Sequence, residues 1–202
     1  MSDLTLLETI KIEDGKVMHL PYHQTRCTES RKALFKAQDI LDLDPVIKAP
    51  PLGVWRCRIC YAQRIKSIEY IPYVTKTIHI LKIVPSTLNY AYKYADRSTL
   101  SSLLDKQGDA DDIIIEKEGY LTDTTIANIA FYDGKQWFTP SKPLLEGTTR
   151  RRLLDEGFLQ TKDIRIQDLQ DYTQVALMNA MIGFDIVKNT HIQDTEGNIY
   201  DY

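Results

Sequence analysis

The chain is poor in cysteine, with three in 202 residues, too few for the disulfide framework that holds small secreted domains together. Cys57 and Cys60 have a C-x-x-C spacing, but they lie in the apolar run Val54–Tyr61, which predicts a β-strand. Residues three apart on a strand point to opposite faces, so the two thiols would not meet. Since no second cysteine pair or histidine cluster accompanies them, we expect buried thiols and no metal site.

Other absences narrow the choice of partner and compartment. The net charge is −3, from 25 basic and 28 acidic residues, so no basic field favours nucleic acid. No apolar run approaches the roughly 20 residues that span a bilayer. The first residues, MSDLTLLETIKIEDGK, are acidic where a secretory signal would be basic. We therefore expect a cytoplasmic protein that binds neither nucleic acid nor membrane.

The first part of the sequence predicts a small α/β lobe over residues 1–85. Asp14-Gly15 between the apolar runs Thr5–Ile12 and Val17–Leu20 indicates a β-hairpin. Pro21 suits the first turn of a helix that continues to about Phe35. A proline-rich loop follows, and further strands are expected at Val54–Tyr61, Ser67–Tyr73 and Thr77–Val84.

The second part predicts a larger β-rich lobe over residues 86–202. Helices are expected at Ser98–Lys106 and from Gly147 to Glu156, where Gly157 would end the helix. Strands are expected at Asp112–Lys117, Tyr120–Thr124, Ile129–Tyr132, Gln136–Phe138, Thr173–Met178 and Ile182–Val187, with a last hairpin at Glu196-Gly197. The class is α+β in two lobes.

Lys93 lies in the tyrosine-rich segment Ser86–Asp96, at the predicted junction of the lobes. Clefts between lobes often bind small molecules, and a desolvated lysine becomes the nucleophilic amine that a Schiff base requires. A surface lysine beside a loop is the alternative.

Gly147-Thr-Thr-Arg150 opens the second predicted helix. Free N–H groups and the positive end of a helix bind phosphate, and threonine hydroxyls add donors. Thr148 or Thr149 could instead only cap the helix. The chain has no G-x-x-x-x-G-K-[ST] or G-x-G-x-x-G motif, so nucleotide binding is disfavoured.

Two further positions carry candidate charges. His23 and Arg26 are three apart and share a helix face, where the arginine could grip a phosphate or simply face solvent. Asp123 ends a predicted strand among hydroxyl residues and could point at a cationic ligand group or cap a turn.

In this order the segments resemble the fold-type IV pyridoxal-phosphate enzymes, the class IV aminotransferase family, from about Leu6 to Val187. That family includes branched-chain aminotransferases, D-amino acid aminotransferases and aminodeoxychorismate lyases. The resemblance rests on Glu8-Thr-Ile with Asp14-Gly-Lys16, His23-x-x-Arg26, Lys93-Tyr-Ala-Asp-Arg97, Gly119–Asp123 with Asn128-Ile129, Gly147–Arg150 and Met178–Met181. The segments Lys93–Arg97 and Asn179–Met181 are most similar to the lyases.

The resemblance implies a two-lobed fold like that of D-amino acid aminotransferase, with pyridoxal 5'-phosphate in the cleft between the lobes. Lys93, in the larger lobe, would be the catalytic lysine that forms the imine, and Asp123 would keep the pyridine nitrogen protonated. Leu145 would pack on the ring, and the phosphate would be held by Arg26, by Thr148 and Thr149, and by the Ala180–Met181 backbone.

Within the family the sequence favours 4-amino-4-deoxychorismate lyase, which eliminates pyruvate to give 4-aminobenzoate for folate biosynthesis. A branched-chain or D-amino acid aminotransferase is the alternative, and Arg97 or Arg58 could bind the carboxylate of the small amino-acid-like substrate. The chain is shorter than usual members and has Asp123 where they have glutamate. These departures keep open a catalytically silent protein that binds a cofactor or a partner. A homodimer is also implied.

Overall fold

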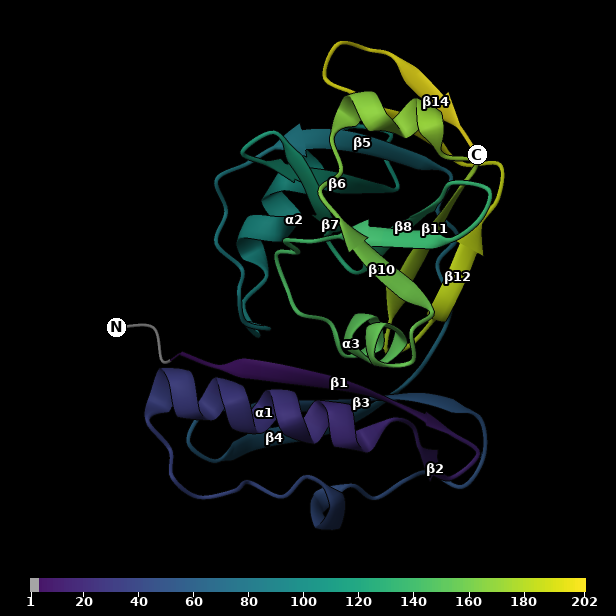
Figure 1. The fold of residues 1–202 in the computed structure, drawn as a ribbon. Coiled ribbons are helices and arrows are strands. Elements are labelled where there is room, and N and C mark those ends of the chain that lie inside the picture. Colours follow the sequence, from purple (N-terminus) through teal and green to yellow (C-terminus); the bar gives the residue numbers. More distant parts are fainter. Residues whose placement is uncertain (1–3) are drawn as a thin grey trace. The chain divides into compact units, whose positions relative to one another are not determined.

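The computed structural model describes residues 4–202, and the chain divides into two compact units (Figure 1). Unit 1 contains the residues up to Thr75 together with Tyr92–Asp96, and unit 2 contains Lys76–Ala91 and Arg97–Tyr202. The expected boundary at residue 85, with Lys93 in the second lobe, is therefore wrong. Strand β5 (Ile80–Pro85) pairs with strands of unit 2, whereas the backbone of Lys93 pairs within unit 1.

Unit 1 is a helix packed on an antiparallel sheet. Its elements are β1 (Leu6–Glu13), β2 (Lys16–Val17), α1 (Leu20–Phe35), the 3-10 turn η1 (Asp44–Val46), β3 (Val54–Tyr61) and β4 (Ile65–Pro72). The sheet order is β2-β1-β3-β4. The first hairpin is confirmed: Asp14 and Gly15 both have positive φ, 46° and 78°, as a tight two-residue turn requires. Its second strand is shorter than expected, because the chain enters α1 already at Leu20.

The two faces of the unit 1 sheet differ in burial. Ile10 on β1 and Cys57 and Ile59 on β3 are fully buried, and Figure 1 shows α1 lying along β1. Cys60, three residues after Cys57, is only partly buried, which confirms that the two thiols occupy opposite faces.

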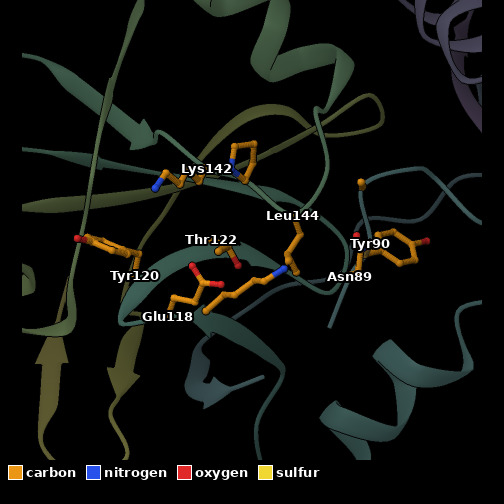
Figure 2. Close-up of a pocket in the computed structure, with 10 residues that line it drawn as sticks. Asn89, Tyr90, Glu118, Tyr120, Thr122, Lys142 and Leu144 are labelled. Carbon is orange, nitrogen blue, oxygen red and sulfur yellow. The ribbon is translucent and has the colours of Figure 1, made fainter. Parts of the chain in front are cut away.

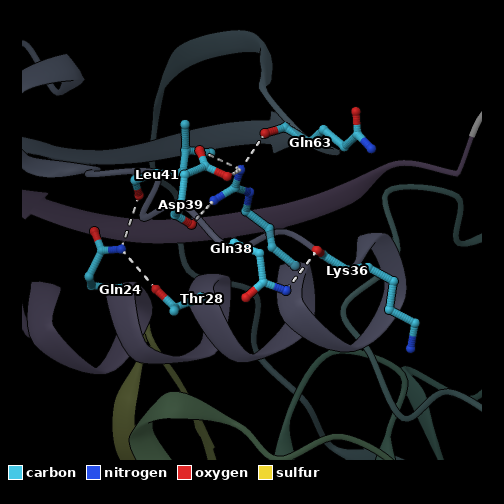
Figure 3. Close-up of polar contacts among 8 residues, drawn as sticks. Gln24, Thr28, Lys36, Gln38, Asp39, Leu41 and Gln63 are labelled. Carbon is cyan, nitrogen blue, oxygen red and sulfur yellow. Dashed lines mark hydrogen bonds and ion pairs between the residues drawn. The ribbon is translucent and has the colours of Figure 1, made fainter.

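The irregular segment after α1 is fastened to the helix by side-chain hydrogen bonds (Figure 3). Gln24 donates to the carbonyl of Leu41 at 3.0 Å and accepts from the amide of Leu43 at 2.9 Å. The buried guanidinium of Arg31 donates to the carbonyls of Asp39 at 3.0 Å and Gln63 at 2.5 Å. These bonds fix the helix that carries His23 and Arg26.

Unit 2 is built on one large mixed sheet. Besides β5, its strands are β6 (Asp112–Lys117), β7 (Tyr120–Thr124), β8 (Asn128–Tyr132), β9 (Trp137–Pro140), β10 (Leu159–Lys162), β11 (Gln174–Asn179), β12 (Gly183–Val187), β13 (His191–Gln193) and β14 (Ile199–Asp201). The order is β10-β9-β8-β7-β6-β5-β13-β14, and β11 pairs with β8 and β12. Strand β5 runs parallel to both of its neighbours, and β10 runs parallel to β9.

The helices of unit 2 are α2 (Ser98–Asp105), α3 (Thr148–Asp155) and the 3-10 helix η2 (Ile166–Asp171). The first two agree with the sequence expectation. The sheet core is apolar, with Ile114, Ile129 and Phe131 among its fully buried residues. Over residues 4–202, the structure has no helix that is both long and apolar enough to cross a membrane.

Candidate functional site

The backbone around Lys93 forms part of the unit 1 sheet. The amide of Leu7 donates to the Lys93 carbonyl at 2.9 Å, and the amide of Ala95 donates to the carbonyl of Thr5 at 2.9 Å. Leu6 and Tyr94 form an antiparallel bridge between these two bonds. The segment thereby occupies the edge of β1 that the short strand β2 leaves uncovered, and it holds Lys93 in a fixed position.

A buried carboxylate organises the side chains near Lys93. Glu8 is fully buried on the core-facing side of β1. Nε of Arg26 donates to Oε1 of Glu8 at 2.9 Å, and Nη2 donates to Oε2 at 2.5 Å. Nδ1 of His23 lies 2.6 Å from Oε2 of the same carboxylate. Nη1 of Arg26 takes no part in this pairing.

The protonation of this cluster follows from its burial. Burial alone would raise the pKa of Glu8, but the charge of Arg26 and the hydrogen bonds from His23 and Arg26 outweigh it and hold the pKa at about 2. Burial lowers the pKa of His23. The positive charges of Arg26 and Lys93 lower it further, and together they outweigh Glu8, which raises it. His23 is therefore neutral near pH 7 and donates its Nδ1 proton to Glu8. Glu8 carries one negative charge, and Arg26 and Lys93 carry one positive charge each, so the cluster has an excess of positive charge.

In unit 2, Asp123 is the corresponding buried carboxylate. It is 4% exposed, and it accepts hydrogen bonds from Asn128 Nδ2 at 2.7 Å and from the amide of Leu145 at 2.9 Å. Asn128 also donates to the carbonyl of Leu145 at 2.9 Å. Burial raises the pKa of Asp123 to about 7, although these neutral donors and the charge of Arg150 oppose the shift. Among the residues described, no cation forms an ion pair with this carboxylate. A cationic N–H beside it would favour the ionised form and lower its pKa.

The start of α3 has the features of an anion site. Its N-cap is Gly147, which makes no side-chain cap bond, so the reading in which Thr148 or Thr149 caps the helix is wrong. Both threonines are buried, and the first helical bond of the turn is from Arg151 to Gly147. The amides of the first turn therefore remain available to an acceptor.

Gly147 also joins this helix to the Asp123 group. A Cβ atom on Gly147 would lie 1.9 Å from Oδ1 of Asn128, the residue that holds Asp123. Only glycine allows the helix to start this close to Asn128.

The turn between β11 and β12 contains Ala180 and Met181. The amide of Met181 donates to Oδ1 of Asn179 at 2.9 Å, so this N–H is already bound within the turn. Nδ2 of Asn179 donates to the carbonyl of Ile126 at 3.2 Å, which ties the turn to the loop that follows Asp123. The predicted role of these two residues stays a prediction.

The two arginines expected at a substrate carboxylate are both engaged. In unit 2, Nη2 of Arg97 donates to the carbonyl of Thr125 at 2.5 Å. In unit 1, Arg58 forms an ion pair with Glu69 at 3.0 Å across β3 and β4. Arg97 keeps its remaining donors, whereas the charge of Arg58 is already compensated.

Sequence reasoning quoted Glu8, Asn128 and Asn179 within the resembling segments but gave their side chains no role. Glu8 gave a usable signal, because a carboxylate at a core-facing position of an apolar strand needs a buried partner. The two asparagines belong to segments that carry the family resemblance, but no local pattern indicated which turns their side chains join.

The Amino-transferase class IV family model matches residues 5–189. A crystal structure from Haemophilus somnus 129PT, provisionally identified as a 4-amino-4-deoxychorismate lyase, is 34% identical with a TM-score of 0.82, over 91% of this chain and 99% of that chain. A Schizosaccharomyces pombe protein, provisionally named aminodeoxychorismate lyase, is 26% identical over 89% of this chain and 87% of its own length. The pyridoxal-phosphate-bound form of a hypothetical aminotransferase from Mycobacterium tuberculosis shares the fold, at 17% identity and a TM-score of 0.73, over 92% of this chain and 81% of that chain. The chain belongs to the class IV amino-transferase family.

Proposed function

We propose that the protein is a pyridoxal-phosphate enzyme that eliminates pyruvate from 4-amino-4-deoxychorismate and releases 4-aminobenzoate. The observation that carries the choice of reaction is the 34% identity to the Haemophilus somnus protein over nearly the whole of both chains. The buried charges described above support the choice of cofactor.

The donor sets fit the two ends of pyridoxal phosphate. Lys93 offers the amine, and Arg26 and the start of α3 offer donors for the phosphate. Asp123 offers a buried carboxylate held by Asn128 and the amide of Leu145, and a protonated pyridine nitrogen would be a cationic partner for it. We propose that both sets bind the same cofactor molecule, with Leu145, Thr148, Thr149 and the Ala180–Met181 turn as further contacts.

The bound cofactor would supply an electron sink for charge that develops beside the substrate nitrogen. Lys93 would take up and return the proton at its Nζ atom, acting as base and then as acid. Glu8 and neutral His23 would hold Arg26 against the phosphate without adding a second negative charge near it. Arg97 is the better candidate for the substrate carboxylate, because Arg58 is already paired with Glu69.

The cofactor is tested first. Purified protein incubated with pyridoxal phosphate and then desalted should be yellow, and borohydride should fix the cofactor mass on the peptide that contains Lys93. Lys93→Ala should lose both signals, whereas Lys135→Ala, at an exposed lysine on the β8–β9 turn, should keep them. Colourless wild-type protein would refute the proposal.

The reaction is tested separately. Loaded enzyme with 4-amino-4-deoxychorismate should release pyruvate, measured with lactate dehydrogenase, and 4-aminobenzoate, measured by its fluorescence. The same preparation is assayed with pairs of amino acids and 2-oxo acids. Amino transfer without pyruvate release would assign an aminotransferase, and a yellow protein silent in both assays would assign a cofactor-binding protein.

We also propose that two copies of the chain associate and that the protein works in the cytoplasm in folate biosynthesis. The dimer and the folate pathway come from the resemblance to the family, and the cytoplasm is the expectation from the sequence. Light scattering of the loaded protein tests the dimer. Cell fractionation tests the compartment, and growth of a deletion strain only when 4-aminobenzoate is supplied would support the pathway.

A further inference from the structure

Unit 2 contains a pocket of about 260 Å³ at the β6–β7 turn (Figure 2). Its buried floor includes Tyr90, Thr122 and Leu144. Asp123 and Leu145, the next residues along the chain, do not line it; they are bonded to one another. The pocket is therefore separate from the candidate cofactor contacts. Its volume lies just below the roughly 300–1,000 Å³ of ordinary ligand pockets, which suits a small metabolite.

Two hydroxyl groups of the pocket, those of Thr122 and Tyr120, already have partners. The hydroxyl of Thr122 donates to the carbonyl of Ile115 at 2.6 Å. The hydroxyl of Tyr120 accepts from Nη2 of Arg165 at 2.7 Å, and the guanidinium carbon of Arg165 lies 4.5 Å from the centroid of the Tyr120 ring. With these hydroxyls engaged, the charged groups of the pocket are the strongest handles for a ligand.

Those charges sum to an excess of one positive charge. Lys117 donates to the carbonyl of Leu88 at 3.3 Å, and an ammonium group has three donors, so two are left for a ligand. The ammonium of Lys142 lies 5.8 Å from the centroid of the Tyr120 ring, and it has no carboxylate partner in the part of the chain that the structure describes. The one acidic side chain that lines the pocket is the exposed Glu118.

We propose that this pocket binds a small carboxylate with a compact apolar body, held by the ammonium groups of Lys117 and Lys142. Figure 2 shows Lys142 and Tyr120 on one side and Asn89 with Tyr90 on the other. Leu144 and Pro143 offer apolar surface to the body of such a ligand. Inorganic phosphate is a poorer match because it is polar on every side. The inference does not depend on the proposed function, because no lining residue belongs to the candidate cofactor contacts.

Benzoate is the probe, titrated into the full-length protein by calorimetry, with benzamide as the uncharged ligand of the same shape. Benzoate should bind more tightly than benzamide, and added salt should weaken it. Lys142→Met should raise its Kd about fivefold, as expected for an exposed ion pair, and the double variant with Lys117→Met should raise it further. The matched control is Lys135→Met, which removes an exposed lysine elsewhere in unit 2 and should change nothing.

Equal binding of benzoate and benzamide, unchanged binding in the double variant, or no binding at millimolar concentration would overturn the proposal. An equal loss of benzoate affinity in Lys135→Met and Lys142→Met would also overturn it, because the loss would then reflect the net charge of the protein and not this pocket. Arg26→Gln separates the two sites. Benzoate binding that survives this change supports the pocket, and binding that is lost with it belongs to the candidate cofactor site.

Discussion

Glu8 and Arg26 form a bidentate ion pair in which the carboxylate is fully buried, with Nε to Oε1 at 2.9 Å and Nη2 to Oε2 at 2.5 Å. The carboxylate occupies a position on β1 where its strand neighbours two residues away, Leu6 and Ile10, are buried apolar side chains. A charge in such a place is tolerated only while its partner is present. The pair therefore links the stability of unit 1 to the orientation of Arg26.

Glu8→Gln should lower the free energy of unfolding by about 3 kcal/mol at pH 7, because it leaves the guanidinium of Arg26 without its counter-charge. Urea unfolding measures the loss. The affinity for pyridoxal phosphate, followed by tryptophan fluorescence, should fall as well because Arg26 is no longer held.

The same pair predicts a dependence on pH. The pKa of Glu8 is about 2 in the folded protein against 4.5 ordinarily, so its contribution is complete above about pH 4.5 and is lost as the pH falls towards 2. Glu8→Gln should remove this acid-side slope. Glu13→Gln, which alters a half-exposed carboxylate on the same strand, should leave stability and slope nearly unchanged. A similar loss in both variants would contradict the argument.

Asp123 should produce the opposite dependence. Its folded-state pKa of about 7 lies above the ordinary 3.8, so the folded protein binds more protons than the unfolded chain between these values. The free energy of unfolding of the cofactor-free protein should therefore fall by up to about 4 kcal/mol as the pH rises from 4 to 7. Urea unfolding across this range measures the slope.

Asp123→Asn should flatten that slope because the side chain can no longer ionise, at a pH-independent cost of about 1 kcal/mol for one mismatched hydrogen bond. Saturating pyridoxal phosphate should also flatten it in the wild type if a cation sits against the carboxylate. Asp185→Asn, at an exposed position on β12, is the control. A wild-type slope that persists in Asp123→Asn would have to come from another group.

The elements that were predicted well carry their signals locally. Asp14-Gly15 sets a tight turn, and Pro21 sets the first turn of a helix. The placement of β5 could not be predicted, because it depends on pairing with β6 and with His191–Gln193, far along the chain. Lys93 was placed in the wrong unit for the same reason. Its segment joins β1 through backbone hydrogen bonds, and such bonds do not depend on which side chains the segment carries.

In the candidate site, too, the features that depend on local sequence were predicted, and those that depend on contacts between distant residues were not. The start of α3 was found because glycine before two threonines is a local pattern. The partners of Arg26 and Asp123 were not found, because Glu8 and Leu145 lie 18 and 22 residues away from them. Which polar groups meet across such separations is decided by packing.

Gly147→Ala should lower the free energy of unfolding by about 1–3 kcal/mol, because its Cβ would lie 1.9 Å from Oδ1 of Asn128. The backbone itself accepts a side chain there, since φ is −70°. In an Asn128→Ala background the added Cβ meets no amide, so the same change should cost under about 0.5 kcal/mol. A double-mutant cycle by urea unfolding measures this coupling, and additive losses would rule out the clash.

Asn179 should control two turns through opposite ends of one amide. Its Oδ1 accepts from the amides of Met181 and Ile182 at 2.9 and 3.0 Å, and its Nδ2 donates to the carbonyl of Ile126 at 3.2 Å. Asn179→Asp keeps the acceptor and loses the donor, so amide exchange should quicken at 126–127 and stay slow at Met181 and Ile182. Asn179→Ala loses both and should quicken exchange in both turns. Hydrogen–deuterium exchange read residue by residue separates these cases, and identical patterns for the two variants would mean that the two ends of the amide do not act independently.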